Sequence, residues 1–182
     1  AFIEKTKLQN TTPGETPSTL DLYVLSYDIN KNLSSPSPTL KQNLSNYLSQ
    51  YRIIGDTINI KDAFVINIGV DFEITVRPNF NSNEVLRNCI SSLISYFNID
   101  DWQINQPIIL KDIEILLDKI EGVQTVKKVE ITNKAGVSLG YSQYSYDVEQ
   151  ATRDRVIYPS LDPMIFEVKI PSTDIKGRVV TF

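Results

Sequence analysis

The sequence contains no histidine, a single cysteine and no long apolar run, and each absence excludes a class of protein. Histidine is the commonest general base and the commonest zinc ligand, so its absence argues against histidine-dependent catalysis and most zinc sites. With Cys89 alone, no disulfide can form within the chain, so folding needs no oxidising compartment. Unbroken apolar stretches, such as residues 63–66, are far shorter than a membrane span.

Clustered positive charge is also scarce. The formal net charge is -4 and the sequence pI is about 4.9, whereas proteins that bind nucleic acid usually carry a basic patch. The nearest candidate, Lys127 with Lys128, is too small, and we interpret it as the solvated face of a strand. We therefore expect neither a nucleic-acid partner nor a membrane partner.

The 182 residues, of which 41% are hydrophobic, suit one globular domain with an appendage. Residues 1–20 are predicted to be a linker, because their polar composition and two prolines, Pro13 and Pro17, leave no periodic apolar face. The chain does not begin with Met, and we expect it to be a piece of a longer polypeptide.

Residues 21–132 are predicted to form an α+β core domain. A buried strand at residues 22–25 precedes a helix that Ser37 can cap and that Pro38 can start. The apolar residues of this helix recur at helical spacing on one face, which indicates an amphipathic helix. They are Leu40, Leu44, Tyr47, Leu48 and Tyr51.

A long strand and a second helix are the clearest elements of this core. Residues 63–76 alternate, with an apolar residue at every even position, which predicts a strand with one covered face. Gly69 suggests a bulge in that strand. Asn81 and Glu84 resemble a capping box, and the following apolar stripe indicates a helix in which Cys89 is a small core residue. The stripe is Val85, Leu86, Cys89, Ile90, Leu93, Ile94 and Phe97.

A third helix at about residues 111–121 and a strand at about 125–132 complete the predicted core. The simplest packing of this order is a mixed sheet with two or three helices on one face, in a ferredoxin-like or split βαβ arrangement. We expect one buried cluster shared by the long strand and the second helix. Its predicted members are Ile66, Ile68, Phe72, Leu86, Ile90 and Leu93.

Residues 133–182 are predicted to be an extended, β-rich C-terminal arm or subdomain, because they show no sustained helical periodicity. Aromatic residues and arginines in this segment can stack on bases or contact another protein, and the acidic balance of the chain favours a protein interface. The alternative is that the arm adds a strand to its own sheet. The candidate interface residues are Tyr141, Tyr144, Tyr146, Arg153, Arg155, Tyr158 and Phe166.

Combinations of residues that carry out catalysis are hard to find in the sequence. The acidic residues around the third helix, such as Asp112 and Glu114, are interpreted as a solvated helix face rather than a metal cluster. The sequence has no Gly-rich phosphate-binding loop, and the GVSLG motif at residues 136–140 is not a membrane-helix motif, because no long apolar helix surrounds it. We expect no catalytic residues, no metal site and no cofactor. The alternative is a hydrolase that uses Asp71 and Glu73, which share the wet face of the long strand.

Four stretches together resemble the baseplate wedge proteins of T-even-type contractile-tailed phages, in the baseplate J-like family. They are residues 37–74, 102–113, 122–131 and 151–180. The resemblance is to the C-terminal part of those proteins and implies a non-enzymatic scaffold in the virion, at the tail baseplate, assembled in the host cytoplasm. It also implies that the chain pairs with itself and with other baseplate wedge proteins, in a ring around the hub that rearranges on sheath contraction. No catalytic residue carries over from the family.

Overall fold

The computed structural model describes residues 2–6, 19–51 and 57–181, and the chain forms two compact units, Ala1–Phe64 and Val65–Phe182. This boundary divides the segment 21–132 that was predicted to be one domain, because the first strands pair among themselves and not with the long strand. Strand β1 (Phe2–Thr6) lies within the predicted linker, residues 1–20, and so corrects that prediction. Residues 7–18 of the linker lie outside the described residues.

The first unit is a three-stranded sheet with one helix. The strand order is β1, β2 (Thr19–Val24) and β5 (Thr57–Asp62), with β1 antiparallel and β5 parallel to β2. Two parallel neighbours need a crossover connection, and this connection contains α1 (Pro38–Ser49). A short hairpin, β3 (Ser26–Tyr27) with β4 (Leu33–Ser34), follows β2.

Helix α1 begins where the sequence predicts. The Ser37 side chain accepts a hydrogen bond from the Leu40 amide, and Pro38 stands at the first helical position. The strand β5 was not predicted, because its alternating TINIKD sequence is short and follows directly on the segment after the helix. The described residues of this unit bury few apolar side chains, which include Leu22, Val24 and Ala63.

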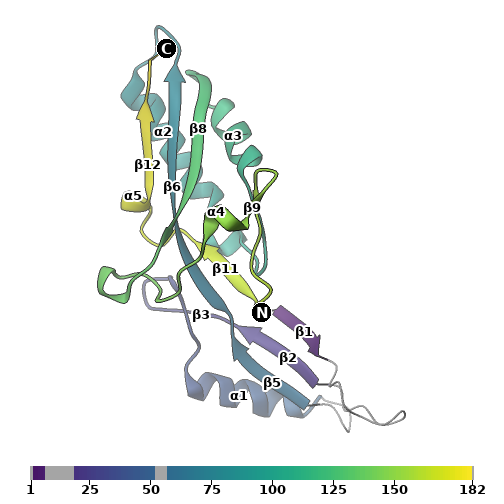
Figure 1. Ribbon diagram of the computed structural model, residues 1–182. Helices are drawn as coiled ribbons and strands as arrows, with labels where there is room; N and C mark the ends of the chain where they lie inside the picture. Colours follow the sequence, from purple (N-terminus) through teal and green to yellow (C-terminus); the bar gives the residue numbers. More distant parts are fainter. Residues whose placement is uncertain (1, 7–18, 52–56, 182) are drawn as a thin grey trace. The chain divides into compact units, whose positions relative to one another are not determined.

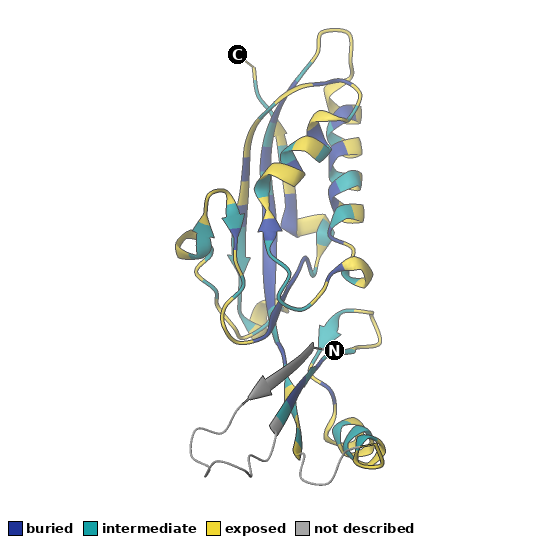
Figure 2. Cartoon of the chain, turned by 90° about the vertical axis from the view of Figure 1, so that its right-hand side faces the viewer, coloured by how far each residue is buried: buried dark blue, intermediate teal, exposed yellow. Residues whose placement is uncertain are grey.

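The second unit is built around the long strand β6 (Phe64–Val76), as Figure 1 shows. Strand β8 (Val123–Lys134) pairs antiparallel with β6, and β12 (Ile175–Val179) pairs parallel with its other edge. Strand β11 (Met164–Glu167) also pairs with β6. Helices α2 (Ser82–Tyr96) and α3 (Leu110–Asp118) cover one face of this mixed sheet (Figure 2). The predicted α+β class and the β-rich C-terminal region are confirmed.

Smaller elements connect these strands and helices. Strands β7 (Ile108–Ile109), β10 (Val156–Ile157) and β9 (Thr152–Arg153) form a separate three-stranded sheet. The remaining elements are the 3-10 turns η1 (Ile99–Asp101) and η2 (Val137–Leu139), and the short helices α4 (Val148–Ala151) and α5 (Pro171–Asp174). Among the described residues, no helix has the length and apolar character needed to span a membrane.

The core of the second unit lies between β6 and the two helices. Ile66, Ile68 and Phe72 of the predicted cluster are buried, as is Leu93 of α2. Leu86 and Ile90 are only half-buried, which corrects the prediction. The physical reason is that only one line of residues four apart on α2 faces the sheet squarely. Leu86, which reaches Gly177 of β12, and Ile90 lie beside this line and stay partly exposed. The residues of this line are Val85, Cys89, Leu93 and Phe97.

Two glycines in the sheet allow other groups to approach the backbone closely. A Cβ atom at Gly69 would lie 2.5 Å from Lys134 Cε and 3.0 Å from the Asp174 carbonyl oxygen. Gly69 pairs with Thr132 in regular register, so the prediction of a bulge at Gly69 is wrong. The register of β6 with β8 shifts further along the strand, between Glu73 and Ile74 and between Thr75 and Val76. Gly177 in β12 is required for a similar reason, because a Cβ there would overlap the Phe72 ring.

Candidate functional site

The seven candidate interface residues of the C-terminal segment do not form one exposed surface. Phe166 lies in β11 and is 1% exposed, so it belongs to the core and not to a free surface. The prediction failed because β11 joins the main sheet, a long-range pairing that composition does not indicate. Tyr146 packs edge-on against Phe166, with 5.7 Å between ring centroids, and is half-buried.

Two of the tyrosines attach the segment to its own unit. The Tyr141 hydroxyl donates to Asp174 Oδ1 at 2.5 Å, and this hydrogen bond raises the pKa of Tyr141. The Tyr146 hydroxyl donates to the carbonyl oxygen of Tyr158 at 2.5 Å, and burial raises the pKa of Tyr146. These two side chains therefore stabilise the fold of the segment.

The other four candidates are exposed. Arg155 forms an ion pair with Glu114 of α3. Glu114 also pairs with Lys111, with 3.4 Å between Lys111 Nζ and Glu114 Oε2. The charge of Glu114 on the acidic helix face is therefore balanced by basic neighbours. Tyr144, Arg153 and Tyr158 are exposed to solvent. The exposed part of the predicted interface is thus reduced to these residues, with Arg155 held against α3.

A buried polar network that the sequence did not predict joins β6 to the C-terminal segment. The Asn67 side-chain amide donates to Glu167 Oε2 at 2.7 Å, and its oxygen accepts from the Ser142 amide at 2.6 Å. Asn67 and Glu167 are both buried. Buried polar groups must be hydrogen-bonded to be tolerated, so this network specifies where the segment lies. Its only signal in the sequence is an asparagine on the face of β6 opposite the apolar residues.

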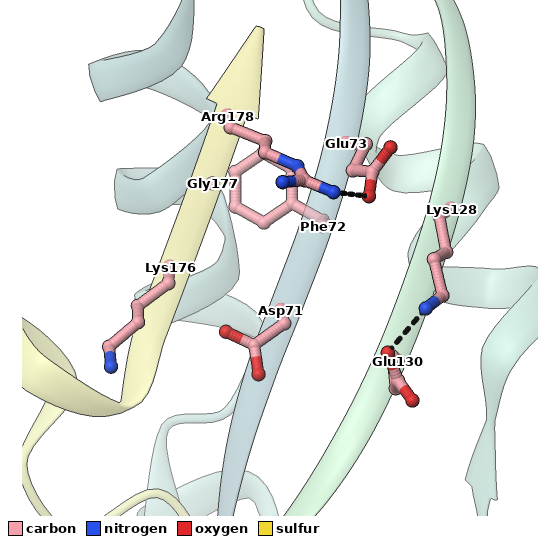
Figure 3. Close-up of a pocket in the computed structure, with 8 residues that line it drawn as sticks. All are labelled: Asp71, Phe72, Glu73, Lys128, Glu130, Lys176, Gly177 and Arg178. Atoms are coloured by element: carbon pink, nitrogen blue, oxygen red, sulfur yellow. Dashed lines mark hydrogen bonds and ion pairs between the residues drawn. The ribbon is translucent and has the colours of Figure 1, made fainter. Parts of the chain in front are cut away.

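The uncovered face of the sheet carries a charged depression of about 310 Å³ (Figure 3). Its charged side chains come from three adjacent strands: β6 supplies two carboxylates, β12 two basic side chains, and β8 one of each sign. Arg178 of β12 forms an ion pair with Glu73 of β6. Lys128 and Glu130, both on β8, form a second ion pair, with 2.6 Å between Lys128 Nζ and Glu130 Oε2. The lining residues are Asp71, Phe72, Glu73, Lys128, Glu130, Lys176, Gly177 and Arg178.

This depression contains both carboxylates of the hydrolase alternative, Asp71 and Glu73. All the lining residues belong to the three adjacent strands of one sheet, and their charged side chains share its uncovered face, so the depression has a floor but no opposing wall. Glu73 is engaged by the guanidinium of Arg178 in an ion pair at the protein surface. Enzyme sites usually lie in concave pockets that bury most of a ligand. The arrangement is typical of a solvated sheet face.

Helix α1 in the first unit has the apolar stripe that the sequence predicts, but none of its residues is buried. Leu44 and Leu48 are half-buried, whereas Tyr47 is 57% exposed and Tyr51, just beyond the helix, is 69% exposed. The two tyrosine rings lie 5.1 Å apart. The only charged residue of the helix, Lys41, lies 2.7 Å from Asp62. The outer surface of α1 is therefore nearly neutral, and it carries exposed tyrosine rings among polar side chains.

Cys89 is confirmed as a core residue, and burial raises the pKa of its thiol to about 11. Because the thiolate is the reactive form, only about one thiol in a thousand is ionised at pH 8. We expect a disulfide reagent such as DTNB to modify Cys89 within minutes in guanidinium chloride, and far more slowly in the native chain. Absorbance of the released thiol measures both rates. Equal rates in the two conditions would contradict the burial of this side chain.

No protein-family model and no curated protein matches this sequence.

Proposed function

We propose that this chain is a structural subunit of a phage tail baseplate wedge, which associates with itself and with other wedge proteins in the virion. In this proposal it contributes to the inner ring around the hub and rearranges when the sheath contracts. The proposal draws on the resemblance of residues 37–74, 102–113, 122–131 and 151–180 to the baseplate J-like family. The function is assembly, without a substrate or a cofactor.

The observation that carries the proposal is the unburied apolar stripe of α1. Tyr47 and Tyr51 leave most of their surface in water, and burying apolar area stabilises a protein by roughly 25 cal/mol per Å². Tyrosine is enriched at protein interfaces because its ring buries area while its hydroxyl stays hydrogen-bonded. A nearly neutral helix surface with exposed tyrosines suits a protein partner rather than a nucleic acid.

The charged face of the second unit supports the same proposal over a hydrolase. Its carboxylates lie on an open sheet surface among basic side chains, and Glu73 is paired with Arg178. The hydrolase alternative predicts turnover of peptidoglycan or glycans that falls in the Asp71→Asn and Glu73→Gln variants. The assembly proposal predicts no turnover by the chain and unchanged association in both variants.

Binding to purified baseplate wedge proteins tests the proposal through α1. We expect the double variant Tyr47→Ser, Tyr51→Ser to bind these partners, or a second copy, roughly tenfold or more weakly, because exposed tyrosines at a contact carry much of its free energy. Isothermal titration calorimetry or light scattering measures the loss. The control is Ile29→Ser, which removes a fully exposed apolar side chain of the same unit outside the helix. Equal losses in the control and in the double variant would contradict a role for α1.

A further inference from the structure

Strand β12 forms one edge of the main sheet of the second unit. Its one strand partner in the part of the chain that the structure describes is β6, and Figure 1 shows it as the outermost strand beside β6. The Val180 amide donates to the Ile74 carbonyl oxygen at 2.9 Å. Because the amide and carbonyl groups of successive strand residues point to opposite edges, Gly177 and Val179 direct theirs away from β6. Strand β12 therefore presents backbone donors and acceptors to a further strand.

Helix α2 carries a line of partly exposed aliphatic side chains beside this edge. Leu86 and Ile90 are half-buried and Ile94 is 41% exposed, and they recur four residues apart, so they form one line along the helix. Leu86 reaches Gly177, which places this line on the β12 side of α2. Tyr96, on the opposite flank of α2, lines a hollow shared with α3. We call Leu86, Ile90 and Ile94 the apolar ledge.

The other face of β12 is basic. Lys176 and Arg178 are exposed and lie on the uncovered face of the sheet, because side chains alternate along a strand. Arg178 is paired with Glu73 of β6. Lys176 extends away from Asp71 in Figure 3, and among the described residues it forms no ion pair. The Lys176 ammonium group can therefore pair with a carboxylate on the outer side of β12.

The neighbouring strand β6 shows which charges complement those of β12. It places Asp71 level with Lys176 and Glu73 level with Arg178, and opposite charges on neighbouring strands are favourable. A strand on the outer side of β12 meets the same two basic side chains, so carboxylates at alternate positions suit it. A second copy of β12 does not suit this position, because its own basic side chains would lie against those of the first. Lysines on edge strands commonly prevent such pairing between like edges.

We infer that the outer edge of β12 binds an extended segment of a partner protein in which acidic and aliphatic residues alternate. The segment pairs with the backbone of Gly177 and Val179 and rests its aliphatic side chains on the apolar ledge. Its carboxylates lie beside Lys176 and Arg178. Strand addition of this kind takes its affinity from main-chain hydrogen bonds and its specificity from alternate side chains. The contact goes beyond the proposed function, which depends on α1 in the first unit.

A short fluorescent peptide that alternates valine and glutamate tests this inference on the full chain. Fluorescence polarisation should show saturable binding, and a peptide with lysine in place of glutamate should bind roughly tenfold or more weakly, because it sets like charges beside β12. In NMR spectra of the complex, the Gly177 and Val179 amides should gain protection from hydrogen exchange, since the bound strand accepts their hydrogen bonds. Absence of saturable binding, or equal binding of the two peptides, overturns the inference.

Two variants locate the contact. Val179→Pro removes an amide that points away from β6 and should weaken peptide binding roughly tenfold or more, with cooperative unfolding retained because edge strands tolerate proline there. Lys176→Gln should weaken binding about two- to fivefold, whereas the matched control Lys127→Gln, at an exposed lysine of β8, should not. If Val179→Pro fails to fold, Lys176→Gln and the amide protection decide the question. Unchanged binding in Lys176→Gln, or protection that appears elsewhere and not at β12, overturns the inference.

Discussion

Deleting residues 133–182 should unfold the second unit rather than release an independent domain. Strand β12 is the parallel partner of β6, and the deleted segment supplies several fully buried side chains. Truncating one such side chain typically costs about 2–5 kcal/mol, and an entire domain is stable by only about 5–15 kcal/mol. The buried side chains lost include Ile157, Met164, Ile165, Phe166 and Ile175.

Thermal unfolding followed by circular dichroism measures this effect. The truncated chain should show no cooperative transition from the second unit, and its near-ultraviolet signal from Trp102, which stacks on Phe97, should be lost. A chain that ends at Val180 serves as the control, because it retains all of β12 and the hydrogen bond from the Val180 amide to Ile74. A truncated chain that unfolds cooperatively with the full signal would show that residues 133–182 are an appendage after all.

Replacing Asn67 by alanine should cost about 2–5 kcal/mol of stability in the second unit. The substitution removes the donor to the buried Glu167 carboxylate and the acceptor for the Ser142 amide at the same time. Removing one partner from a buried polar group costs more than the hydrogen bond itself contributes, since the remaining group stays desolvated. The loop that carries Val137 and Leu139 should also lose protection from hydrogen exchange.

Urea denaturation of the variant and the parent chain gives the free-energy difference, with hydrogen-exchange mass spectrometry for the loop. Asn88→Ala, at an exposed position of α2, is the matched control and should change stability by less than about 0.5 kcal/mol. If Asn67→Ala changes stability no more than this control does, the buried network does not hold the C-terminal segment in place.

Local features of the fold could be predicted from the sequence. The alternation of residues 63–76 gave β6 to within one residue, and the caps at Ser37 and Asn81 gave the starts of α1 and α2. These predictions depend on short-range periodicity and on hydrogen bonds within one turn. After the second helix the chain forms the 3-10 turn η1, and Trp102 stacks on Phe97.

Long-range pairing could not be predicted in the same way. Nothing near Ile175 in the sequence indicates that it lies beside Val70, or that Gly177 is required by the ring of Phe72. The division at Phe64 depends on β2 pairing with β5, which a short alternating strand signals only weakly. Such contacts depend on tertiary structure rather than on local propensity.

The candidate site shows the same limit. Aromatic composition selected both Phe166, which is buried in β11, and Tyr144, which is exposed, because composition does not distinguish a core residue from an interface residue. Val137 and Leu139 in the GVSLG segment are exposed, which the motif alone did not indicate. Asn67 accepts a hydrogen bond from the Ser142 amide and Asp174 one from the Tyr141 hydroxyl, and both contacts join distant parts of the chain.

The molar mass of the full chain in solution, measured by sedimentation equilibrium over a wide range of concentrations, tests the proposed assembly function most directly. A subunit that pairs with itself should show a weight-average mass that rises from 20.6 kDa towards twice that value or more as concentration increases. The rise should be smaller in the Tyr47→Ser, Tyr51→Ser variant. A mass of 20.6 kDa at every concentration, with no binding to purified wedge proteins, would contradict the proposal.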